Sequence, residues 1–83
     1  MSTKIDRRDD VNREQGVRDY GDVDFADPTN HKYPIDSADH VRAAWQYIQQ
    51  AGNASKYDKD GVELIKKRIK RAATRHGVEI SQD

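Results

Sequence analysis

The densest block of chemically useful side chains in this sequence is a run of cations near its C-terminal end. The block consists of Lys66, Lys67, Arg68, Lys70, Arg71 and Arg75. A helix that presents several cations can neutralise phosphate groups without reading a base sequence, and such binding weakens as the salt concentration rises. The alternative interpretation is an ordinary solvated helix face. We therefore take these six residues as candidate nucleic-acid contacts.

The residue types used in catalysis and metal binding lack the spacing that those chemistries need. The four serines have no flanking glycine elbow and the chain has no cysteine, so acyl transfer has no candidate nucleophile. His31, His40 and His76 match no zinc-ligand pattern, and no glycine-rich phosphate loop is present. We therefore predict a protein that is not an enzyme and that needs no metal or cofactor.

Charge is distributed unevenly over the 83 residues, although the net charge is zero. Residues 1–30 hold eight acids and five bases, which gives −3, and residues 31–83 hold seven acids and ten bases, which gives +3. This asymmetry predicts an acidic arm ahead of a mildly basic domain. No apolar run approaches the roughly 18 residues of a membrane span, and no signal-peptide core is evident. We expect a cytoplasmic protein without a membrane partner.

The elements that must position the cations are two amphipathic helices, predicted over residues 37–51 and 59–76. In the first, Val41, Trp45 and Ile48 belong to an apolar stripe at helical spacing, and Val62, Ile65 and Ile69 form the stripe of the second. Asp36 or Ser37 is expected to cap the first helix, and Gly52-Asn53 to end it. Asp58 and Gly77 are expected to cap the second.

The chain ahead of these helices is predicted to be extended and then disordered. Pro28 and Pro34 favour extended backbone before them, so we expect a strap that presses Phe25 and Tyr33 onto the helices. Residues 1–22 carry too few aliphatic side chains to offset the entropy of ordering, which predicts a disordered acidic arm. The prediction is thus an all-α fold, an antiparallel two-helix hairpin with an N-terminal strap, in one domain over residues 23–80 followed by a frayed tail over residues 81–83.

The predicted core and one unsettled aromatic residue follow from these stripes. The core is expected to consist of Phe25, Tyr33, Val41, Trp45, Ile48, Val62, Ile65 and Ile69. Trp45 could stack a nucleic-acid base, but its place on the stripe favours the core. Tyr47 lies off the stripe, so packing under the strap and an exposed contact are both open.

Several short blocks of this sequence together resemble a small bacterial and phage domain of unknown function. They are residues 24–28 (DFADP), 32–36 (KYPID), 41–45 (VRAAW), 53–57 (NASKY) and 65–69 (IKKRI), closing at His76-Gly77. That domain occurs alone or fused to phage prohead proteases and capsid-related chains. The resemblance spans roughly residues 24–78 and implies a compact helical module of prophage origin. It implies no catalytic residues, because the family has none assigned.

The hypothesis from the sequence is a non-enzymatic binding module. Its partner would be nucleic acid, contacted through the cations, or a phage or host protein. The alternative is protein–protein docking or self-association without nucleic acid, because the core is small and a partner could share the apolar stripes. The oligomeric state is left open.

Overall fold

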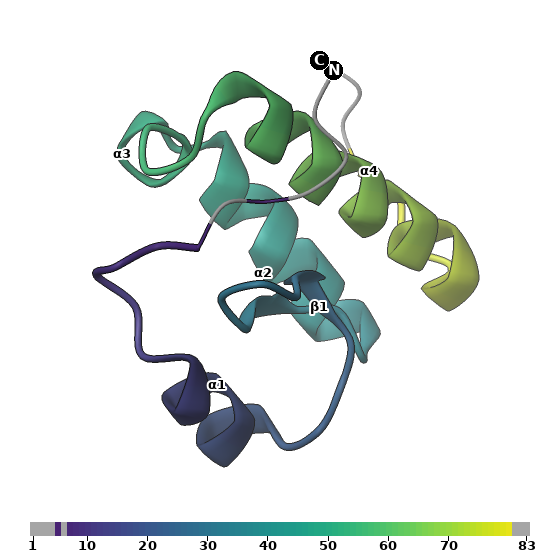
Figure 1. Ribbon diagram of the computed structural model, residues 1–83. Helices are drawn as coiled ribbons and strands as arrows, with labels where there is room; N and C mark the ends of the chain where they lie inside the picture. Colours follow the sequence, from purple (N-terminus) through teal and green to yellow (C-terminus); the bar gives the residue numbers. More distant parts are fainter. Residues whose placement is uncertain (1–4, 6, 81–83) are drawn as a thin grey trace.

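The computed structural model describes Ile5 and residues 7–80, and the predicted tail at residues 81–83 lies outside the described residues. Within that part, the order of elements is α1 (Arg13–Tyr20), β1 (Phe25–Asp27), β2 (Lys32–Pro34), α2 (Ala38–Gln49), α3 (Ala51–Ala54) and α4 (Lys59–His76). In Figure 1, α2 and α4 lie side by side, and the β1–β2 hairpin lies between α4 and α1. No helix of the described chain is long and apolar enough to cross a membrane.

Local capping chemistry sets the ends of the two long helices. The Ser37 hydroxyl accepts a hydrogen bond from the amide of His40 at 3.2 Å, and the Asp58 carboxylate accepts one from the amide of Gly61 at 2.7 Å. Gly77 ends α4 in the left-handed region, with φ 68°. The expectation that Gly52 ends the first helix is wrong, because α2 stops at Gln49 and Gly52 lies inside the short helix α3.

The core lies where the apolar stripes of α2 and α4 meet. Val41, Ile48, Ile65 and Ile69 are completely buried, and Trp45 is 5% exposed. Phe25 is buried as well, while Tyr33 and Val62 are partly buried and pack against the core. Burial of each large aliphatic side chain is worth about 1.5–3 kcal/mol. The contact between α2 and α4 is therefore the main source of stability.

The predicted all-α hairpin is wrong, because the fold is a mixture of helices and an antiparallel two-stranded sheet. The strap folds into the β1–β2 hairpin, with Phe25 opposite Pro34 and Asp27 opposite Lys32. The buried Asp27 carboxylate closes the turn by accepting from the amide of Asn30 at 3.1 Å and from its side-chain nitrogen at 2.8 Å. The Asp27 side chain thus satisfies the amide of Asn30 within the turn, as an Asp before a Pro commonly does, and the segment with the two prolines pairs with itself.

The predicted disordered arm is also wrong for the part of it that the structure describes. Ile5 is buried in the core and residues 13–20 form α1, with Asn12 as its N-cap. Gly16 is buried against the backbone of His31, so α1 lies directly on β2. An eight-residue helix is not stable in isolation, so α1 forms because tertiary contacts stabilise it.

Candidate functional site

The structure divides the six predicted cations between two sides of α4. Arg68 donates from Nε and Nη2 to the carbonyl oxygen of Phe25 at 3.2 and 3.0 Å, and Arg75 lies 3.6 Å from the Asp24 carboxylate. Both arginines thus face the β1 side of the molecule and hold the hairpin on α4. Lys66 and Lys70 lie on the opposite flank of the helix, next to Trp45, and Lys67 and Arg71 lie between the two flanks.

The other four cations form a surface that we name the cationic face, made of Lys66, Lys67, Lys70 and Arg71. The ammonium groups of Lys66 and Lys70 lie 5.8 and 5.7 Å from the centre of the Trp45 ring, within the range of a cation–π contact. Lys67 and Arg71 are exposed and one helical turn apart. Among the described residues, none of the carboxylates forms a salt bridge with these four cations.

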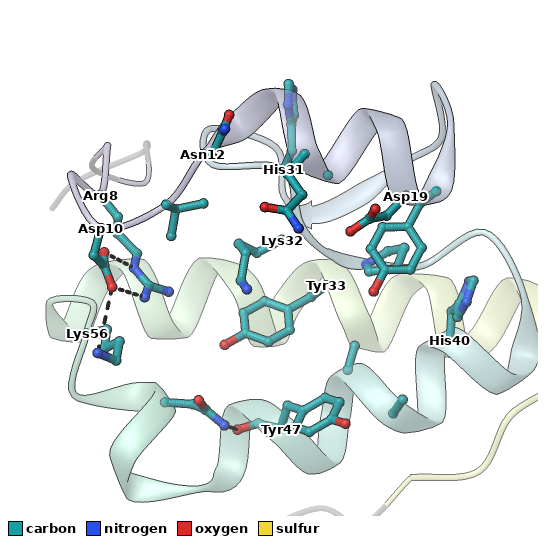
Figure 2. Close-up of a pocket in the computed structure, with 18 of the residues that line it drawn as sticks. Arg8, Asp10, Asn12, Asp19, His31, Lys32, Tyr33, His40, Tyr47 and Lys56 are labelled. Atoms are coloured by element: carbon teal, nitrogen blue, oxygen red, sulfur yellow. Dashed lines mark hydrogen bonds and ion pairs between the residues drawn. The ribbon is translucent and has the colours of Figure 1, made fainter.

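A groove of about 780 Å³ lies away from the cationic face, between α1 and α2. Residues 8–12 and α1 form one wall, α2 forms the other, and β2 lies between them (Figure 2). The rings of Tyr20 and His40 meet edge to face at one end, 5.6 Å apart. The ion pairs of Asp10 with Arg8, at 2.6 Å, and with Lys56, at 3.7 Å, bridge the other end.

A buried polar network positions the wall that the arm contributes. The Tyr57 hydroxyl donates to Asp27 at 2.7 Å and accepts from Arg8 at 3.2 Å, and the amide of Arg8 donates to the side-chain oxygen of Asn30 at 2.6 Å. Burial, together with the hydrogen bond to Asp27, raises the pKa of Tyr57. The phenol therefore stays protonated and keeps donating to Asp27.

Among the described residues, two of the cations that line the groove form ion pairs, and a third does not. The hydrogen bond from Arg8 holds the pKa of Asp10 down at about 2, so this carboxylate is ionised at neutral pH. Arg8 and Lys56 thereby share one carboxylate, which leaves the three groups with a net charge of +1. Lys32, in the middle of the groove, has no salt bridge within the described part of the chain.

The backbone that lines the groove is strained at one residue of β2 and at the residue just before β2. His31 has φ 55° and Tyr33 has φ 62°, the left-handed region that bulky residues rarely adopt. Each such residue costs on the order of 1–3 kcal/mol, and strain of this kind is concentrated at functional sites. In Figure 2 the ring of Tyr33 extends into the groove with its hydroxyl toward the Arg8 end. Burial raises the pKa of this phenol, which keeps it a hydrogen-bond donor.

Reasoning from the sequence missed the groove because one wall comes from the N-terminal arm and α1, for which no folded structure was predicted. The arm was expected to be disordered, so Tyr20 and Arg8 were given no partners. Tyr47, left open between packing and exposure, lines the groove and is 52% exposed. Gly16, alone within a charged stretch, was the one available signal, since a glycine there permits close approach to another backbone.

Metal binding has no cluster of ligands to support it in the part of the chain that the structure describes. No group of three or more His, Cys, Asp or Glu side chains there could hold an ion. His40 instead bonds through Nδ1 to Asp36 at 2.6 Å, and this contact lowers the pKa of Asp36. His31 bonds through Nδ1 to the carbonyl oxygen of Arg13 at 2.9 Å. Both histidines thus have structural partners.

The fold defines a small mixed α/β domain. The chain belongs to a family of unknown function, DUF6582, whose model matches residues 1–83. No curated protein and no solved structure gives a significant match to it. The match to a domain of unknown function extends over the whole sequence, beyond the blocks on which the resemblance rested.

Proposed function

We propose that this protein is a non-enzymatic binding module that contacts the phosphates of nucleic acid through its cationic face. The observation that carries the proposal is the set of four cations on α4 that no carboxylate of the described chain neutralises. Two of them, Lys66 and Lys70, are held by the Trp45 ring. Side chains that are already ordered lose less entropy when a phosphate binds.

Arrangement on a helix favours sequence-independent binding. The cations at i, i+1, i+4 and i+5 lie along one side of α4, where they can follow a phosphate backbone, and α4 contains no glutamine or asparagine that could read base edges. Four phosphate contacts predict a slope of about −3.6 for the logarithm of the binding constant against the logarithm of salt concentration with duplex DNA.

The test is fluorescence anisotropy with a labelled duplex and a labelled single strand at about 50 mM salt, where electrostatic binding is strong. Reversal of charge in Lys67→Glu with Arg71→Glu should abolish binding. The matched control is Arg13→Glu with Arg18→Glu, which changes the net charge equally at two exposed positions of a different helix, α1. Absence of binding by the parent protein, or equal loss in both double variants, would refute the proposal.

A second readout comes from the only tryptophan in the chain. Because Lys66 and Lys70 lie over Trp45, phosphates that bind them there should change the electrostatic surroundings of the ring and therefore its emission. The charge-reversed pair, Lys67 and Arg71, does not touch the ring. Binding to another surface would leave the emission unchanged, which distinguishes the cationic face from the rest of the molecule.

A phage-derived context is part of the proposal and rests on the resemblance alone. In that context the module would act in genome packaging or capsid assembly, next to a phage or host protein. Gene neighbourhood tests this: adjacent capsid or prohead-protease genes would support it, and their absence across family members would remove it. The rival candidate, docking onto protein without nucleic acid, is favoured by a different feature, the groove.

A further inference from the structure

We propose that the groove binds a peptide segment of a partner protein, one in which a carboxylate lies beside an aromatic or large apolar side chain. The proposal concerns a surface distinct from the cationic face and is independent of nucleic-acid binding. It rests on the charge of Lys32, which is unpaired among the described residues, on the tyrosines that line the groove with it, and on the strained backbone at His31 and Tyr33 that holds this part of the groove in place.

Lys32 supplies the anchor for the carboxylate. It lies in the middle of the groove between two strained residues, His31 and Tyr33, so its position is set by the backbone. Arg8 and Lys56 at one end already share Asp10, whereas Lys32 forms no salt bridge with any described acid. A ligand carboxylate at this point would gain a charge-assisted bond that the protein itself leaves unmade.

Tyrosines supply the surface for the neighbouring side chain of the ligand. Tyr47 on α2 and Tyr20 on α1 are 52% and 45% exposed, and both line the groove with Tyr33. Two of the three large apolar side chains that the described chain leaves exposed thus face one cavity, next to the small Ala43. Tyrosine rings give large contact area at low entropic cost, which suits recognition of a peptide side chain.

Charge argues for a peptide over a nucleic-acid strand at this surface. Asp10 and Asp19 both line the groove, and they would repel a run of phosphates. With Arg8 and Lys56 engaged by Asp10, one cation is left to meet a strand that carries a charge at every nucleotide. The groove also presents the Gln15 side chain, which can donate to and accept from a peptide backbone.

The test uses the full chain, isotopically labelled for amide NMR, and two pools of short synthetic peptides. One pool carries a central Glu beside Trp or Tyr with the flanking positions randomised, and the other pool carries Gln in place of Glu. We expect the Glu pool to shift amides of α1, β2 and α2 that surround the groove. The Gln pool should bind at least about tenfold more weakly, because the bond to a charged group is lost.

Variants separate the groove from the rest of the surface. Lys32→Gln keeps most of the side chain and should weaken binding by about tenfold, and Tyr47→Ala should weaken it as well. Neither side chain is buried, so both variants should have the melting temperature of the parent. Lys59→Gln, an exposed cation outside the groove, should bind like the parent.

Three results would overturn the proposal. The first is no groove shifts with the Glu pool, and the second is equal affinity for the Glu and Gln pools. The third is that a single-stranded oligothymidylate shifts the groove amides and the peptides do not. Amide shifts that the Glu pool causes only in α4 would refute the proposal in the same way as the first result.

Discussion

Substitution of two glycines by alanine provides a sharp test of how the arm is attached. Gly16 lies in α1 with its α-carbon against β2, and a β-carbon added there would lie 2.3 Å from the carbonyl oxygen of His31 and 2.8 Å from its β-carbon. Real contacts of this kind are not shorter than about 3 Å, so α1 must move off β2. A β-carbon added at Gly52 in α3 would have no neighbouring atom within 4 Å.

The two variants should therefore change stability in opposite directions. Alanine in a helix gains up to about 1 kcal/mol over glycine, whereas forced overpacking costs about 1–3 kcal/mol. Gly16→Ala should lose about 1–2 kcal/mol of the free energy of unfolding, and Gly52→Ala should gain up to about 1 kcal/mol. For a domain of this size, 1 kcal/mol shifts the melting temperature by roughly 4–8 °C.

Thermal and urea unfolding measure the difference, and limited trypsin digestion locates it. A short helix released from β2 does not stay folded, so Arg13 and Arg18 should be cut faster in Gly16→Ala than in the parent. Gly52→Ala should be cut at those sites like the parent. A Gly16→Ala protein as stable as the parent, with unchanged cleavage, would refute the docking of α1 on β2.

Three further predictions concern the core, the polar network and acid. Trp45→Ala should cost about 3–5 kcal/mol, comparable to the whole stability of a small domain, so circular dichroism should show unfolding near room temperature; a melt like that of the parent would contradict this. Tyr57→Phe should cost about 1–3 kcal/mol in urea unfolding, because the buried Asp27 loses a donor, whereas Tyr47→Phe should be nearly neutral. Asp10 has a pKa of about 2 in the folded state, below the ordinary 3.8, so its contribution is complete above that ordinary value and is lost as the pH falls toward 2. Asp10→Asn should make the acid profile flatter over that range, and an unchanged profile would show that the ion pair contributes nothing.

The arm supports the groove and leaves the cationic face independent of it. Its network through Tyr57 and Asp27 holds one wall of the groove, and loss of that network should open the groove without touching α4. Tyr57→Phe should therefore weaken peptide binding while leaving the salt dependence of nucleic-acid binding unchanged. This separation allows the two proposals to fail independently.

The sequence by itself determined the two long helices, because the signals that place them are local. Apolar residues at helical spacing, Ser37 and Asp58 as N-caps and Gly77 as a left-handed C-cap act within a turn or two of the residues they affect. These interactions are present in the chain before it folds. The ranges predicted for both helices consequently lie within two residues of α2 and α4.

Only the tertiary structure decided the sheet, the arm and the surfaces. Asp27 closes the β1–β2 turn from a buried site, and α1 forms against β2 through Gly16, so neither element has enough local stability to be visible in its own segment. The same contacts removed Arg68 and Arg75 from the predicted cation cluster and placed Lys32 in a groove. Long-range contacts, which a sequence pattern does not encode, assign each side chain to the fold or to the surface.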